Sequence, residues 1–155
     1  MVFSDFVAAL SNELGFAIET EGDTCAIRAG ATESSSVTVL LQGFDERGAV
    51  LTTADLGAPP PERLEKLFRS LLEANDLFRD TGGATLSLDP ATGHVRLQRF
   101  DAIDAIAEAG PGKALLVFLD VAAAWAAVIR DYRDAPDDAA AEDAATDDTA
   151  PGFLV

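Results

Sequence analysis

Few residues in this sequence have the types and spacing that catalysis or metal binding requires. Cys25 is the single cysteine and His94 the single histidine, so the clusters of thiolates and imidazoles that bind zinc have no counterpart. Three serines at 34–36 lack the Gly-x-Ser-x-Gly setting of an activated nucleophile. The sequence therefore predicts no catalytic, cofactor or metal site, and it favours a protein that works by binding.

The stretch TGGATLSLDPATGHVRL at 81–97 holds the remaining candidates for chemistry. A phosphate-binding loop needs a lysine and a following helix, and Thr81-Gly82-Gly83 has neither. Small residues there instead suit a sharp bend from a helix into a strand. Asp89 begins a DPATG segment, in which aspartate, proline and glycine are typical of a short hairpin loop.

Composition predicts one soluble domain with an acidic appendage. The chain has 155 residues, of which 48% are hydrophobic, and its formal net charge is −16. Seven of the 27 acidic residues and none of the 11 basic ones lie in 134–155, so the rest of the chain is acidic as well. This charge repels phosphate backbones, and we expect no nucleic-acid partner.

The same sequence predicts a cytoplasmic protein. A lone cysteine suits a reducing compartment, and the N-terminus lacks the basic start of a secretory signal. The longest apolar run, 114–129, contains Asp120 and is expected to be a core helix without insertion into a membrane.

The first part of the chain predicts one helix followed by three strands. Ser4 is the expected cap and Gly15 the expected end of a helix over 5–14. The apolar residues at its helical spacing are Phe3, Phe6, Val7, Leu10 and Leu14. Three β-rich runs at 24–29, 36–44 and 49–54 are separated by turn-forming segments, which predicts an antiparallel meander.

The second part predicts a helix, a hairpin and a long helix. Helix 61–74 follows three prolines, and Leu77 and Phe78 are expected to form an apolar plug after it. Alternating runs at 85–88 and 95–98 predict the hairpin, 101–110 a loop or short helical turn, and 113–133 the last helix. The core residues expected in that last helix are Leu115, Phe118, Trp125 and Ile129.

The predicted order α-β-β-β-α-β-β-α indicates an α+β fold with a twisted, mainly antiparallel sheet flanked by helices. Residues 1–133 are expected to form this domain. The Ala-, Asp- and Thr-rich residues 134–155 are expected to be an acidic, disordered tail.

The centre of the sequence resembles the class I type III secretion chaperones, the CesT-like and SycE-like proteins. The similar segments are LEANDLF at 72–78, TGG at 81–83, LSLD at 86–89, TG at 92–93 and VRL at 95–97. The element order, acidity and length also fit over about residues 3–133. The tail after Asp134 is longer and more acidic than the family pattern requires.

This resemblance implies a bacterial cytoplasmic homodimer without enzymatic activity. Such a chaperone binds the N-terminal region of exported effectors, keeps that region extended, and presents it to the export apparatus, with the export ATPase as a further candidate partner. Physically, an extended client can pair with an exposed strand edge while its side chains fill apolar grooves.

The resemblance also implies roles for two apolar sets. The residues expected to bind the client are Phe3, Phe6, Val7, Leu10, Leu40 and Phe44. The residues expected at the dimer interface, or in the core beneath it, are Leu64, Leu67, Phe68 and Leu71. An apolar stripe serves core and interface equally, so the sequence leaves these roles open.

Two other functions remain as alternatives. One is an adaptor or regulator of the same fold that binds a folded partner without a role in secretion. The other is a small-molecule enzyme, which the lack of clustered histidines, cysteines or paired acids disfavours.

Overall fold

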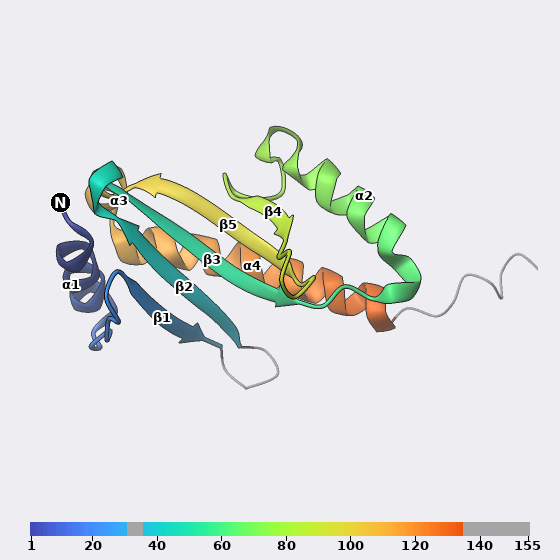
Figure 1. Cartoon of the computed structure of the whole chain (residues 1–155), viewed down its shortest axis with the longest axis horizontal. Helices are drawn as coiled ribbons and strands as arrows, with labels where there is room; N and C mark the ends of the chain where they lie inside the picture. The colour runs from blue at the N-terminus through green and yellow to red at the C-terminus, as the bar shows by residue number, and fades with distance from the viewer. Residues whose placement is uncertain (31–35, 135–155) are drawn as a thin grey trace, which may run out of the picture.

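The computed structural model describes residues 1–30 and 36–134, which form four α-helices and five β-strands with three short 3-10 helices between them (Figure 1). In chain order the elements are α1 (Phe3–Leu14), β1 (Thr24–Ala29), β2 (Val37–Phe44), β3 (Ala49–Gly57), α2 (Leu64–Asn75), β4 (Thr85–Leu88), β5 (Val95–Ala102), α3 (Ile103–Ala109) and α4 (Pro111–Asp134). This is the expected α+β architecture. Residues 31–35 of the predicted turn lie outside the described residues. Of the predicted tail, 134–155, only Asp134 is described, and it is the last residue of α4.

All five strands form one antiparallel sheet in the order β1-β2-β3-β5-β4. Strands β1 and β4 are therefore its two edges. Helix α4 runs behind the sheet in Figure 1, and α2 lies beside β4 at the other end from β1. The core lies between the sheet and the helices, because one residue in two along the strands points toward α4.

Helix α1 begins two residues earlier than predicted and without the predicted cap. Its N-cap residue is Val2, and no side chain caps it, so the role expected for Ser4 was wrong. Gly15 ends the helix as expected, at φ 76°, a left-handed conformation that favours glycine. At the other end of α1, Phe3 packs directly against Gly43 of β2, where any Cβ would collide with the ring.

Two further segments differ from expectation. Residues 103–109 form the two-turn helix α3, with Ile103 and Ile106 buried. Leu77 and Phe78 do not form a buried plug, since their side chains are exposed. The helical alternative for 101–110 is thus the correct one, although residues 101 and 102 belong to β5, and the predicted plug at Leu77 and Phe78 was wrong.

Helix α4 supplies one side of the core. Its buried residues include the predicted Leu115, Phe118, Trp125 and Ile129. By length and composition alone α4 is also apolar enough to cross a membrane, a property that core helices of soluble proteins share. Its buried stripe packs on the sheet, and Arg99 of β5 lies over the Phe118 ring.

Candidate functional site

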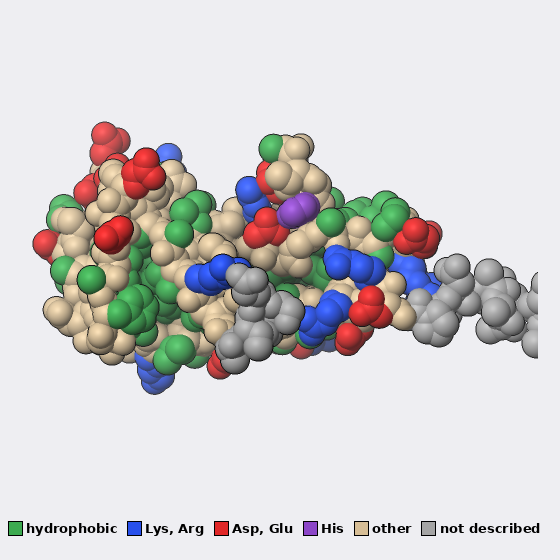
Figure 2. All heavy atoms as spheres, turned by 90° about the horizontal axis from the view of Figure 1, so that it is seen from below, with side chains coloured by type: hydrophobic (Ala, Val, Ile, Leu, Met, Phe, Trp, Pro, Cys, Tyr) green, Lys and Arg blue, Asp and Glu red, His purple; other side chains and the backbone are tan. Residues whose placement is uncertain are grey.

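A groove of about 620 Å³ runs along α1 and the segment that follows it. Its walls are both polar and apolar, with Val7 and Ser11 on the helix and Ile18 on the following segment. The Ile18 amide donates to Ser11 Oγ at 3.2 Å, which holds that segment beside the helix. Figure 2 views the molecule from the β1 side, and hydrophobic side chains gather at the α1 end of this face.

The outer edge of β1 lies on the same side of the molecule. Thr24 and Glu21 exchange backbone hydrogen bonds of 2.8 and 3.1 Å, while Asp23 accepts from Gly43 of the neighbouring strand. Backbone direction alternates along an antiparallel strand, so Ala26 also directs its amide and carbonyl away from β2. No described residue bonds these groups of Ala26. This edge can therefore accept another extended chain.

No described helix lies across the sheet face opposite α4 (Figure 1), and apolar side chains on that face are exposed. Leu40 is 43% exposed and Phe100 53% exposed. The rings of Phe44 and Phe100 meet edge to face, with centroids 5.6 Å apart, and half-buried Leu51 pairs with Phe100 in the intervening strand. We call Leu40, Phe44, Leu51 and Phe100 the open-face patch.

The residues expected to bind a client thus fall into two settings. Phe3, Phe6, Val7 and Leu10 are buried in the protomer, although Val7 also lines the α1 groove. Leu40 and Phe44 lie in the open-face patch. Sequence reasoning missed Leu51 and Phe100, although the period of two along β5 places Phe100 on the face opposite buried Leu97.

Helix α2 divides its apolar residues between core and solvent. Of the residues expected at a dimer interface, Leu67 and Leu71 are buried in the protomer, Phe68 is partly buried and Leu64 is exposed. The most exposed apolar side chains at this end are ones that sequence reasoning did not select, namely Leu72 at 71%, Leu77 at 82% and Phe78 at 54%.

Strand β4, unlike β1, has a side chain bonded to its outer edge, at Leu86. Asn75, the last residue of α2, accepts the Leu86 amide at Oδ1 over 2.8 Å. Its Nδ2 donates to the Leu86 carbonyl over 3.0 Å. One side-chain amide thereby satisfies both backbone groups that a neighbouring strand would otherwise pair with.

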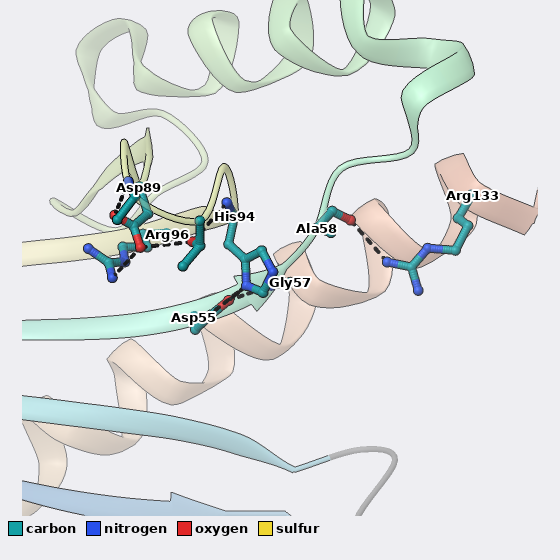
Figure 3. A network of polar contacts seen from close by, with 9 residues as sticks. Asp55, Gly57, Ala58, Asp89, His94, Arg96 and Arg133 are labelled. Carbon is teal, nitrogen blue, oxygen red and sulfur yellow. Dashed lines mark hydrogen bonds and ion pairs between the residues drawn. The ribbon is translucent and has the colours of Figure 1, made fainter.

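A polar network fixes the β4–β5 hairpin (Figure 3). Asp89 is buried and accepts from the Ala91 amide, Thr92 and Arg96, and these contacts lower the pKa of its carboxyl group. His94 Nδ1 lies 3.0 Å from Asp55 of β3. Asp89 therefore stabilises a hairpin loop, as the sequence predicted.

Within residues 1–30 and 36–134, Cys25 lies on edge strand β1, whereas Asp89 and His94 lie in the hairpin at the opposite edge of the sheet. Burial raises the pKa of the Cys25 thiol to about 11, which leaves it protonated at neutral pH. In residues 1–30 and 36–134, no three His, Cys, Asp or Glu side chains lie close enough to hold a metal. Together, the groove, the free edge and the open-face patch form the candidate protein-binding surface.

The Tir chaperone protein (CesT) family matches residues 5–125 of this sequence. The protein therefore belongs to the CesT family and is a type III secretion chaperone, as its central motif indicated. No curated protein sequence matches it.

Solved structures with a similar fold come from complexes. A chain of the ExsC-ExsE complex is 21% identical, with a TM-score of 0.59 over 81% of this chain and 91% of that one. A chain of the HopA1-SchA chaperone-effector complex is 16% identical, with a TM-score of 0.59 over 86% and 94%. A chain of the ExoT-SpcS complex from Pseudomonas aeruginosa is 16% identical, with a TM-score of 0.52 over 76% and 90%. At sequence identities of 16–21%, these matches show a similar fold only.

Proposed function

We propose that the protein is a cytoplasmic type III secretion chaperone that binds the N-terminal region of exported effectors. It keeps that region extended and delivers it to the export apparatus, where the export ATPase is the candidate receiver. The observation that carries this proposal is the family match over residues 5–125. The similar fold of a chain in the HopA1-SchA chaperone-effector complex supports it.

In this proposal an extended client segment pairs with the outer edge of β1. The Ala26 amide and carbonyl offer main-chain hydrogen bonds that do not depend on the client's side chains. The α1 groove beside that edge takes alternate side chains of the client, and the open-face patch takes a further apolar segment. Several client sequences can bind to such a surface, because it recognises only the apolar pattern and the extended backbone of the client.

The buried residues of α1 have a supporting part in this proposal. Phe3 and Phe6 stack with their ring centroids 6.4 Å apart, and the Phe3 amide donates to Asp45 at 2.7 Å. These contacts hold α1 on the sheet and so shape the groove that Val7 lines. Leu10 belongs to the same buried set.

We also propose a homodimer formed through the α2 end. Exposed Leu72, Leu77 and Phe78 give a soluble chain an apolar surface that a second protomer can cover. Leu64 adds to this surface, while Leu67, Phe68 and Leu71 support it from beneath. The binding unit is residues 1–133, with 134–155 as an acidic appendage.

Affinity capture of the tagged full chain from its host under secretion-inducing conditions tests the chaperone proposal. We expect secreted proteins to be captured, and expect capture to be lost when their N-terminal regions are deleted. Leu40→Asp should reduce capture, whereas Leu116→Asp, at an exposed leucine on α4, should not. Recovery of folded cytoplasmic proteins alone would instead support the adaptor.

A further inference from the structure

The outer face of α4, which points away from the sheet, is apolar and exposed (Figure 1). Leu116 is 56% exposed and Val117 46% exposed. Ala123 and Ala124, two turns further along the same face, are exposed as well. A surface helix normally turns a polar face outward and keeps its apolar stripe for the core. Helix α4 instead presents apolar side chains on both sides.

Few charges interrupt this outer face. Within 113–127 the charged residues are Lys113 and Asp120 alone. The most apolar stretch of α4 is 33% buried, although helices that are apolar all round are usually covered by protein or lipid. Soluble proteins rarely leave a contiguous apolar surface without a binding partner. Neither the candidate client surface nor the proposed dimer surface includes this face, so it needs an occupant of its own.

Residues 135–155 contain a segment of matching chemistry. Apart from alanine and proline, their apolar residues are Phe153, Leu154 and Val155, which follow one another. All acidic residues of the tail precede this segment, and Asp148 is the last of them. The stretch 149–155 is therefore uncharged. It can approach Asp120 without the repulsion that the acidic part of the tail would meet there.

The length of the connection also fits. Leu116 lies about 27 Å from Asp134 along α4, at a helical rise of about 1.5 Å per residue. The sequence predicts that the tail lacks fixed structure. A chain of about 19 residues, the separation of Phe153 from Asp134, then has an r.m.s. end-to-end distance of about 25 Å. A tether whose r.m.s. length matches the span gives its end the highest effective concentration at the site.

We propose that Phe153, Leu154 and Val155 dock on the outer face of α4 of the same chain, over Leu116 and Val117. The tail folds back along α4, so its acidic residues pass the basic residues in the last turns of the helix before the uncharged segment reaches the apolar part. Docked in this way, the segment covers exposed apolar surface. It also holds the acidic tail behind the sheet, away from the β1 edge and the open-face patch.

The charges on the outer face disfavour two other occupants. A second copy related by a two-fold axis through the middle of the face would bring Asp120 close to its own image, and like charges in a contact are unfavourable. A cytoplasmic membrane surface is anionic and repels a chain with a net charge of −16. Lys113 is the single basic residue that the apolar part of the face could offer to lipid headgroups.

Amide chemical shifts in two-dimensional NMR spectra of the full chain test the docking. Phe153→Asp should shift the amides of Leu116, Val117 and Ala123, because it releases the docked segment. Ala140→Asp is the matched control, since it adds the same charge in the acidic part of the tail, and it should leave these amides in place. In a Leu116→Asp background, Phe153→Asp should cause no further shift at Val117, because the docking site is already lost.

Identical α4 amide shifts in wild type and Phe153→Asp would overturn the docking. Shifts at Leu40 and Phe100 instead would overturn it by placing the segment on the open-face patch. Shifts that grow with protein concentration would assign the face to a second copy, and α4 shifts that require anionic vesicles and persist in Phe153→Asp would assign it to a membrane. Effector capture is measured separately, so the docking can fail while the chaperone proposal stands.

Discussion

The two edge strands of the sheet differ in whether their outward-facing backbone groups have hydrogen-bond partners. At β4, the Asn75 side chain bonds both outward-facing backbone groups of Leu86. At β1, the corresponding groups of Ala26 have no partner among the described residues. Unpaired edges invite strand addition, and proteins usually protect them. One edge of this sheet is thus protected at Leu86 by a specific side chain, and the other is left open beside the mixed polar and apolar groove along α1.

This difference separates the two binding tasks of the proposed function. At β1 the Ala26 groups are open to an extended client, whereas the Leu86 groups of β4 are already bonded by Asn75. The β4 end instead offers exposed side chains on α2 and the turn after it, which suit contact between folded surfaces. Client and second protomer would therefore occupy opposite ends of the sheet without competing.

The largest expected change in the free energy of unfolding comes from a substitution in α1, and it tests whether this helix belongs to the core or to the client surface. Phe6→Ala should lower the free energy of unfolding by about 3–5 kcal/mol, since Phe6 is buried and its removal leaves a cavity. Leu40→Ala, at an exposed position in the open-face patch, should change it by about 0.5 kcal/mol or less. Urea unfolding measures both. A small effect for Phe6→Ala would show that α1 contributes little to the core.

The second prediction concerns a variant that should make the outer edge of β4 resemble that of β1. Asn75→Ala loses two hydrogen bonds and leaves the Leu86 backbone groups unpaired, so we expect a loss of about 1–3 kcal/mol in the free energy of unfolding. Because β4 then resembles β1, the variant should also associate more at high concentration, as measured by light scattering. The control is Asn12→Ala, at an exposed asparagine of the α1 groove. Destabilisation without added association would show that Asn75 only anchors α2.

Much of the architecture could be predicted from the sequence because it depends on local signals. Strand period, turn residues and the glycine at the end of α1 gave the order of elements and the hairpin loop at Asp89. The early start of α1 was missed because the Phe6 amide bonds the Val2 carbonyl without help from a capping side chain.

The candidate site was harder to predict, since it depends on which apolar residues the tertiary structure covers. Phe6 and Leu40 are both apolar residues in amphipathic elements, yet one is buried and the other exposed. The role of Asn75 depends on a contact with Leu86, 11 residues away, that forms only once α2 lies beside β4. The family motif contains Asn75 but does not reveal this contact.

A proline in β1 tests the open edge directly. In Ala26→Pro the lost amide is one that faces away from β2, so the ladder with β2 should persist, as proline is tolerated at edge positions. Client binding should weaken by about tenfold, the equivalent of about 1.4 kcal/mol. Cys25→Pro is the matched control, because the Cys25 amide faces β2 and its loss should disrupt the fold. Unchanged affinity of Ala26→Pro for a captured effector would place the client elsewhere than the β1 edge.

The smallest effect concerns the hairpin that sets the register of β4 and so supports the closed edge. Hydrogen bonds from Ala91 and Thr92, together with Arg96, lower the pKa of Asp89 in the folded protein. Its carboxylate therefore stabilises the fold above the unfolded-state pKa of about 3.9, and this contribution is lost as pH falls through the lower folded-state pKa. Asp89→Asn should be less stable than wild type from pH 5 to 8, and the difference should shrink below about pH 4 as wild-type Asp89 becomes protonated. Thermal unfolding across this pH range measures both proteins. A difference that stays constant down to the acid limit would show that shape and hydrogen bonding at Asp89, rather than its charge, hold the hairpin.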